Sequence, residues 1–250
     1  MNDASSPDTA QLPLTLGIDI GGSHLKAGLL DARGDMVGER HRVDTPADPT
    51  PAVVCDALIA MGNTIGHFDR ISIGFPGVVR SGRVLTAPHL GTQAWRNFPL
   101  AARLADALGK PARLLNDAEV AGLGVISGHG VECVITLGTG MGFALFQDGL
   151  VAPHLEMSHH PVHGGHTYDE YVGEAAREKV GKKRWNKRVE RVIGILQTVV
   201  TYDTLYIGGG NTKFIRFPPP EGVQIVANEA GITGGVRLWD PVLDRLFPSR

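Results

Sequence analysis

Apolar and polar residues alternate along the first half of the chain with a period that changes between strand-like and helix-like. The elements that this pattern predicts are three strands between residues 14 and 43, a helix over 52–65, a strand over 71–75, a helix over 100–108 and a strand over 113–115. The second helix ends at Gly109-Lys110-Pro111, a typical stop signal. Strands that alternate with helices in this way indicate an α/β fold.

After Asp117 the same order of elements begins again. The predicted elements are a helix over 118–126, strands over 132–137, 143–147 and 205–207, and a long helical stretch over 168–200 with a break at Gly181. A unit of three strands joined by turns therefore occurs twice, which predicts two halves facing a cleft. The predicted domains are a flexible tail at 1–13, an α/β domain over 14–117 that a C-terminal helix at about 236–250 completes, and a second α/β domain over 118–235.

Glycine-rich turns follow the first strand of each half. Asp19-Ile20-Gly21-Gly22-Ser23 is the first, and Gly138-Thr139-Gly140 is the second. Glycine lets the backbone turn sharply and bring its N–H groups close to an anion. One such turn is usually a hairpin, but two in similar settings indicate a duplicated unit built around a phosphate. A third glycine run, residues 208–210, ends the last predicted strand.

Composition restricts the class of protein further. The chain has 250 residues, 42% of them apolar and 20% charged, as in ordinary globular proteins. Its formal net charge of -2 gives no reason to expect nucleic acid or an anionic membrane as a partner. No apolar run approaches the roughly 20 residues of a membrane span, and residues 1–11 lack the apolar core of a signal peptide. Cys55 and Cys133 are too few for a disulfide framework, so we expect a cytoplasmic protein.

Charged residues at the first glycine turn fit phosphoryl transfer. This chemistry needs backbone donors and a cation around the phosphates, and a carboxylate that accepts the acceptor's proton. Lys26 has the charge to neutralise a phosphate, and Asp19, at a strand end, has the oxygen atoms that a hydrated Mg²⁺ prefers. The alternative is structural: Asp19 caps a turn and Lys26 is a surface residue.

Asn116-Asp117 stands at the carboxyl end of a predicted strand, where α/β sheets place their ligands. Asp117 is therefore the candidate general base, and Asn116 offers a donor and an acceptor for a sugar hydroxyl. Asn and Asp are also favoured before a helix, so an N-cap is an equally good interpretation of the pair. The two roles are compatible.

Two further clusters leave alternatives open. Glu156 and His159 stand three residues apart, and His160, His163 and His166 follow. A metal site is disfavoured there, because zinc sites of this kind usually add thiolates and no cysteine is near. The basic run on the long helical stretch comprises Lys179, Lys182, Lys183, Arg184, Lys187, Arg188 and Arg191. Such a run is usually a solvated helix face, and it suits a polyanion only if it borders the cleft.

Taken together, the motifs resemble those of the ROK sugar kinases, and most closely the branch with the bacterial polyphosphate glucokinases. The similar stretches are Leu16–Lys26, Gly74–Val79, Asn116–Ala118, Thr136–Phe146, Glu156–His159, Thr167–Gly173 and Leu205–Gly210. They occur in matching order and cover most of the chain from Leu14 to about Val236. Each stretch alone is weak, but the set is specific.

The resemblance implies a duplicated two-domain, actin-like (ribonuclease H-like) fold with the active site in the cleft between the domains. It implies that Asp117 deprotonates the sugar 6-hydroxyl, which attacks the terminal phosphoryl group of the donor. The implied sugar-binding residues are Asn116, Glu156, His159, Gly77 and one acidic residue of Asp169-Glu170, for which we prefer Asp169. Asp19 would hold Mg²⁺ through water. The implied phosphate-binding residues are Gly21, Gly22, Ser23, Lys26, Gly138, Thr139, Gly140, Gly209 and Gly210.

Three departures from the family pattern refine these expectations. The cysteine-rich zinc motif of typical ROK kinases is absent, so no zinc site is expected and His159 would serve the sugar directly. Ser158 stands where the family usually has glycine, which affects the turn and the sugar preference. The segment after Gly210 is short and proline-rich, which weakly favours a donor other than ATP.

The leading hypothesis is a kinase that transfers phosphate from polyphosphate or ATP to the 6-hydroxyl of glucose or a similar hexose. The alternatives are a kinase for another hexose and a catalytically silent sugar-binding member of the family. A sugar-responsive repressor is disfavoured, because only about 13 residues precede the first predicted strand. The resemblance also suggests a homodimer.

Overall fold

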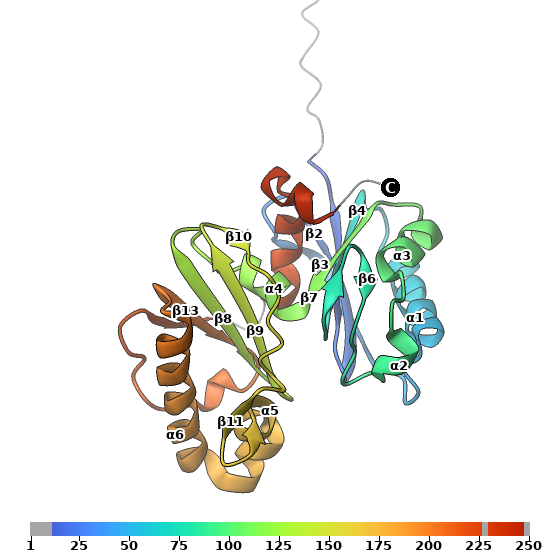
Figure 1. Cartoon of the computed structure of the whole chain (residues 1–250). Helices are drawn as coiled ribbons and strands as arrows, with labels where there is room; N and C mark the ends of the chain where they lie inside the picture. Colours follow the sequence, from blue (N-terminus) through green and yellow to red (C-terminus); the bar gives the residue numbers. More distant parts are fainter. Residues whose placement is uncertain (1–11, 227–229, 248–250) are drawn as a thin grey trace, which may run out of the picture.

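The computed structural model describes residues 12–226 and 230–247, and these form two halves that each contain a five-stranded sheet (Figure 1). The first sheet has the order β3-β2-β1-β4-β7. Its strands are β1 (Thr15–Ile20), β2 (His24–Leu30), β3 (Met36–Asp44), β4 (Arg70–Phe75) and β7 (Ala112–Asn116). The second sheet has the order β10-β9-β8-β13-β14. Its strands are β8 (Val131–Leu137), β9 (Met141–Gln147), β10 (Leu150–Val151), β13 (Thr204–Gly208) and β14 (Val223–Ile225).

Both sheets are built in the same way. In each, three consecutive strands pair antiparallel, and the first of them then pairs in parallel with a later strand, β4 in one half and β13 in the other. A further parallel strand, β7 or β14, completes the sheet. The predicted duplication and the α/β class are therefore confirmed. The limits of the two domains at Asp117 stay a prediction.

In the first half, two helices cover the apolar face of the sheet. They are α1 (Pro51–Thr64) and α3 (Leu100–Leu108), and the core beneath them includes Leu16, Ile18, Val54, Leu58 and Leu104. The short helix α2 (Thr92–Trp95) adds the fully buried Trp95, whose ring packs against Phe75 at 5.0 Å between centroids. A small hairpin of β5 (Val79–Arg80) and β6 (Arg83–Val84) lies beside it.

In the second half, α5 (Tyr168–Val172) and α6 (Glu174–Val200) cover the sheet. The predicted break at Gly181 is confirmed by its non-helical φ of 76°. A second break, at Gly173, was not predicted. A side chain at Gly173 would lie 2.5 Å from the carbonyl oxygen of Thr139, so the chain turns where it touches the second glycine turn. A hairpin of β11 (Pro161–His163) and β12 (His166–Thr167) precedes α5.

The helix α4 (Asp117–Leu123) lies between the halves, together with the C-terminal segment. The helix predicted over 118–126 thus begins one residue earlier and ends at Leu123. The C-terminal segment forms α7 (Ala230–Thr233) and two 3-10 helices, Gly234–Trp239 and Pro241–Leu246, rather than the single helix predicted over 236–250. Ser72 of β4 donates to the carbonyl of Gly235 at 2.7 Å and accepts from the indole of Trp239 at 2.9 Å, which ties this segment to the first sheet.

One more helical segment follows the last glycine run, the 3-10 helix at Thr212–Phe214. Across the described ranges, every helix is too short or too polar to cross a bilayer.

Candidate active site

Two adjoining pockets lie between the halves. The central pocket has a volume of about 190 Å³. It is lined by Gly21, Gly22, Pro76, Gly77, Pro88, His89, Asn116, Asp117, Thr136, Gly138, Thr139, Gly140, Met141, Gly142, Phe143, His154, Glu156, Ser158 and Asp169. The adjoining pocket, about 260 Å³, is lined by Asp19, Gly21, Lys26, Asp117, Ala121, Val125, Val134, Thr136, Gly138, Gly208, Gly209, Gly210 and Val226. Asp117 is one of four residues that line both pockets, so its carboxylate stands where they meet.

Asp117 occupies the first position of α4, directly after β7. Its Oδ1 accepts a hydrogen bond of 2.8 Å from the backbone N–H of Ala118. Removal from water raises the pKa of Asp117 to about 7, and the nearby negative charges of Asp19 and Glu156 add to this. A carboxylate with such a pKa can accept a proton near neutral pH and release it again, as a general base must.

Asn116 acts as the N-cap of α4. Its Oδ1 accepts from the N–H groups of Ala118 and Glu119, and its Nδ2 donates to the carbonyls of Phe75 and Gly77 at 3.3 and 3.2 Å. The capping interpretation is therefore confirmed, and the side chain also fixes the loop that carries Gly77 against the central pocket. A contact between Asn116 and a sugar stays a prediction.

A chain of buried charged groups links α4 to the loop after β10. The side chain of Glu119 accepts from the backbone N–H of Asn116, and its other oxygen lies 2.9 Å from Nδ1 of His154. Nε2 of His154 then lies 3.6 Å from Glu156, which accepts from the hydroxyl of Ser158. Burial by itself would lower the pKa of His154, but the two glutamates more than offset this and raise it to about 9.

The contacts with His154 and Ser158 place Glu156 in the central pocket. Burial opposes its ionisation, yet the ion pair with His154 and the hydrogen bond from Ser158 keep its pKa below the ordinary value. Glu156 is therefore a ready hydrogen-bond acceptor. Sequence reasoning did not find His154 or Glu119. Asn116 and Glu119 have the spacing of a capping box. This spacing is the sequence signal from which Glu119 could have been found.

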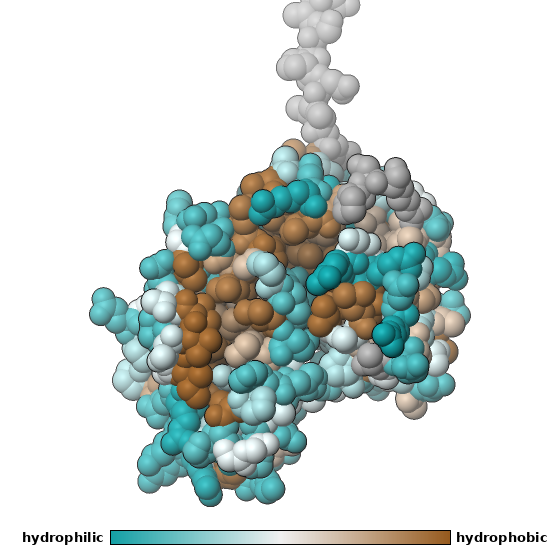
Figure 2. Space-filling model, in the orientation of Figure 1, coloured by the Kyte–Doolittle hydropathy of each residue, from teal (hydrophilic) through white to brown (hydrophobic). Residues whose placement is uncertain are grey.

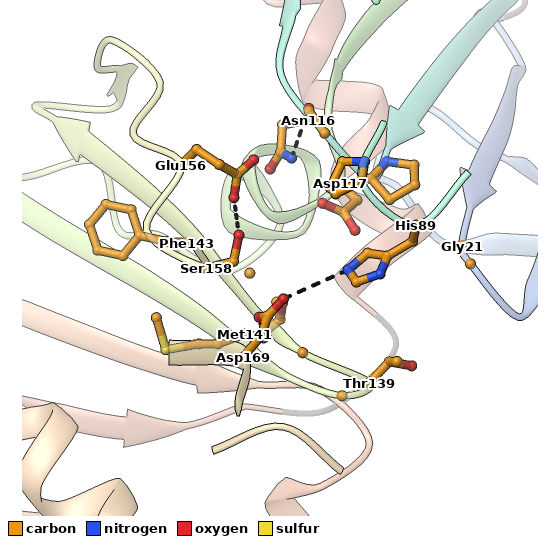
Figure 3. Close-up of a pocket in the computed structure, with 18 of the residues that line it drawn as sticks. Gly21, His89, Asn116, Asp117, Thr139, Met141, Phe143, Glu156, Ser158 and Asp169 are labelled. Atoms are coloured by element: carbon orange, nitrogen blue, oxygen red, sulfur yellow. Dashed lines mark hydrogen bonds and ion pairs between the residues drawn. The ribbon is translucent and has the colours of Figure 1, made fainter. Parts of the chain in front are cut away.

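Asp169 also lines the central pocket, on α5 (Figure 3). Its Oδ1 accepts a 2.7 Å hydrogen bond from the N–H of Met141 in the second glycine turn. Its Oδ2 lies 3.8 Å from Nε2 of His89, a residue of the first half that sequence reasoning also missed. Burial raises the pKa of Asp169. Glu170, the other candidate, instead accepts from the N–H of Thr167 in a capping box at the start of α5.

His159 takes a different place from the one that the resemblance implies. It is exposed and is not part of the lining of the central pocket. Its predicted contact with the sugar stays a prediction. Within 12–226 and 230–247, no three His, Cys, Asp or Glu side chains form a group that could hold a metal ion by themselves.

The glycine turns meet around the junction of the pockets. Gly21 and Gly138 line both pockets; Gly22, Thr139 and Gly140 line the central one, and Gly209 and Gly210 the adjoining one. Gly209 has a φ of 92°, and a side chain there would lie 2.4 Å from the carbonyl of Leu137, so only glycine fits. Ser23 is exposed and lines neither pocket.

Asp19 and Lys26 form an ion pair in the adjoining pocket, with 2.7 Å between the carboxylate and the ammonium. They are directly opposite each other on β1 and β2. The Asp19 side chain is 15% exposed and that of Lys26 30%, so both are partly buried. Their roles toward a metal and a phosphate stay predictions.

The basic run of α6 does not border these pockets. None of its seven residues contributes to the lining of either one. Arg184, Lys187, Arg188 and Arg191 line a separate hollow with Tyr171, on a part of the molecule whose lower end is hydrophilic in Figure 2. The ring of Tyr171 lies 4.5 Å from the guanidinium of Arg188. The condition set for a polyanion track on α6 is therefore not met.

Comparison with known proteins agrees with this arrangement. Residues 15–175 match the ROK family. The chain is 30% identical to a polyphosphate glucokinase of Mycobacterium tuberculosis (strain CDC 1551 / Oshkosh), over 92% of this chain and 95% of that protein. The crystal structure of an inorganic polyphosphate/ATP-glucomannokinase from Arthrobacter sp. strain KM is similar with a TM-score of 0.78 and 30% identity, over 90% of this chain and 97% of the other.

A third similar structure is that of a ROK family glucokinase from Streptomyces griseus, with a TM-score of 0.72 over 90% of this chain and 98% of that one; at 20% identity it supports the fold alone. The fold is that of the actin-like sugar kinases. The chain belongs to the ROK family.

Proposed function

We propose that the protein is a sugar kinase that transfers the terminal phosphoryl group of polyphosphate or ATP to the 6-hydroxyl of glucose or a similar hexose. The observation that carries this proposal is the place of Asp117 at the junction of two pockets, one with hydrogen-bonding side chains and one with glycine turns and a lysine. The relatives named above are kinases of this kind, which supports the same reaction.

The central pocket suits the sugar. Glu156 and Asp169 offer carboxylate acceptors, and His89, across the pocket from Asp169, offers a donor (Figure 3). Asp117 faces the same space and accepts the proton of the 6-hydroxyl as this oxygen attacks the terminal phosphorus. The bond from phosphorus to the bridging oxygen of the donor breaks, and the shortened donor leaves with the electron pair. The raised pKa of Asp117 matches this proton transfer to neutral pH.

The adjoining pocket suits the donor phosphates. Residues of all three glycine turns line it, and Lys26 supplies a positive charge. The carboxylates of Asp19 and Asp117 both line this pocket, and oxygen ligands of this type with substrate phosphates are what Mg²⁺ takes. Asp19 would hold the ion, through water, and the ion would neutralise charge on the phosphates. Lys26 would then shift from Asp19 to a phosphate oxygen.

We also propose that the protein is cytoplasmic and has no nucleic-acid or membrane partners, as its composition suggests, and that it is a homodimer, as the family resemblance suggests. Sedimentation of the purified protein tests the dimer directly, because a mass near 26.6 kDa would contradict it.

An activity assay tests the function. Purified protein with Mg²⁺ and glucose or mannose is supplied with ATP and polyphosphate separately, and sugar 6-phosphate is measured. Asp117→Asn should reduce the rate by about 10²–10⁴-fold, the usual loss for a general base. Asp48→Asn, at an exposed loop aspartate, is the control and should leave the rate unchanged. Calorimetric binding of sugar without any product from either donor would favour the silent sugar-binding protein instead.

A further inference from the structure

Strand β3 presents positively charged side chains beside the adjoining pocket. It is the edge strand of the first sheet and is exposed along most of its length. Arg42 is directly opposite Lys26 of β2, and opposite residues of an antiparallel pair point to the same face. Arg40 is two residues from Arg42, at the register shift of β3 beside Gly28, and shares that face. Its Cγ lies 4.0 Å from the place that a side chain on Gly28 would take, which agrees with this orientation.

This basic face is continuous with the first glycine turn. The guanidinium of Arg42 contacts the ring of His24, and the carbonyl of His24 accepts from the N–H of Gly21 at 2.9 Å. Thr45, just after β3, donates its hydroxyl to Gly21 at 2.7 Å and its N–H to Ser23 at 2.9 Å. The end of β3 is therefore fixed to the turn that we assign to the donor phosphates.

Positive charges outnumber negative charges on this face. By the strand register its acidic groups are Asp19, already paired with Lys26, and Asp44, which lies 3.5 Å from His24. Arg40 and Arg42 have no carboxylate within ion-pair distance among the described residues. Charged residues on an edge strand, lysine especially, also prevent sheets from joining, but that purpose does not require them to lie beside a phosphate pocket. Two arginines on one face beside a phosphate pocket are better explained by an anion.

We propose that Arg42 and Arg40, continuing outward from Lys26, bind the distal phosphates of a linear polyphosphate donor. Alternate residues of a strand are about 7 Å apart, so the positive charges are spread along a line rather than gathered around one compact anion. ATP ends in a nucleoside instead of further phosphates and would not engage both arginines. This inference rests on the proposed kinase function, whose donor it specifies.

The test compares long-chain polyphosphate with ATP. In Arg40→Gln/Arg42→Gln, the KM for long-chain polyphosphate should rise roughly five- to thirtyfold, as expected for the loss of two exposed charge contacts. The KM for ATP and kcat with ATP should stay unchanged. Added salt should raise the KM for polyphosphate in the wild type and raise it less in the variant, because screening weakens exposed charge contacts.

Arg184→Gln/Lys187→Gln is the matched control, since it removes two positive charges from the separate hollow on α6. It should leave both KM values unchanged. A loss of polyphosphate use in this control but not in the β3 variant would overturn the proposal and assign the polyanion to α6. An equal loss with ATP in the β3 variant would overturn it as well, as would a wild type that uses ATP but not polyphosphate.

Direct binding separates this proposal from the kinase function. Calorimetry without sugar measures the affinity of the wild type and of both variants for long-chain polyphosphate. If neither donor yields product, the kinase proposal fails. The β3 proposal then stands if Arg40→Gln/Arg42→Gln weakens polyphosphate binding at least fivefold relative to the α6 control, and falls if the two variants bind alike.

Discussion

The two glycine turns occupy equivalent places in the two sheets but carry different chemistry. Asp19 of β1 and Thr136 of β8 each lie two residues before the first glycine of their turn. Their partners on the next strand are Lys26 and Gly142. An ion pair in one half thus corresponds to a neutral pair in the other, where the hydroxyl of Thr136 fills the space that a side chain at Gly142 would need.

The edge strands of the two sheets, β3 and β10, also differ in charge. β3 is nine residues long and exposes arginines, whereas β10 is two residues long and carries Leu150 and Val151. Val151 packs with the core that contains α4 and the C-terminal segment. The duplicated frame therefore gives each half a glycine turn, while the charged residues that we propose for a metal and a long anion lie in the first half. The second half contributes Glu156 and Asp169, the proposed contacts to the sugar.

The largest effect is expected where the halves are joined, at His154. His154→Gln leaves Glu119 buried without its charged partner, and removing one partner of a buried pair costs about 3–5 kcal/mol of unfolding free energy. Urea denaturation measures this. The pKa of His154 is raised from 6.5 to about 9 in the folded protein, so its contribution is fully present below pH 6.5 and is lost as the pH rises through about 9. The difference in unfolding free energy between His154→Gln and the wild type should therefore become smaller as the pH rises through about 9.

His159→Gln is the control for this prediction, because His159 lies on the same loop but is exposed. Its effect should stay within about 0.5 kcal/mol, as for most surface substitutions. Equal stability losses in the two variants, or none in either, would mean that the chain from Glu119 to Glu156 does not hold the halves together.

The sequence predicted the frame well and the partners of the site less well. Period and turn residues are local signals, so the strands around Gly21 and Gly138 and the break at Gly181 could be found from the chain alone. The capping role of Asn116 was also visible locally. His89 and His154 were missed because each acts through a residue distant in sequence, Asp169 and Glu119, which only the fold brings near.

The break at Gly173 was missed for the same reason. Nothing in its neighbours predicts an interruption, and the cause is its contact with Thr139 across the second glycine turn. Asp169 was preferred over Glu170 as a sugar-binding residue because Tyr171 then takes its usual place in the family motif. In the structure Asp169 faces the pocket while Glu170 caps α5, a distinction set by where helix α5 begins.

A pair of substitutions at the equivalent positions tests the contrast between the turns. Asp19→Asn should lower kcat/KM by roughly 10- to 100-fold, the usual cost of losing a group that holds a metal through water. The loss should be partly recovered at higher Mg²⁺. Thr136→Ala, at the equivalent place in the second half, should cost less and should not respond to Mg²⁺. The same Mg²⁺ dependence in both variants would show that the two turns share the metal, contrary to the proposed division.

The pH dependence of the rate offers the finest test, because it depends on how both halves act on Asp117. Its ionised form is the base, so kcat/KM should rise about tenfold per pH unit below its pKa of about 7 and level off above it. Burial is the main cause of the raised pKa, and the charge of Asp19 adds to it. Asp19→Asn should therefore move the profile to lower pH, whereas Thr136→Ala should leave its midpoint in place. A wild-type profile that is flat through neutral pH would contradict the raised pKa, and an unmoved midpoint in Asp19→Asn would show that the first half does not tune the base.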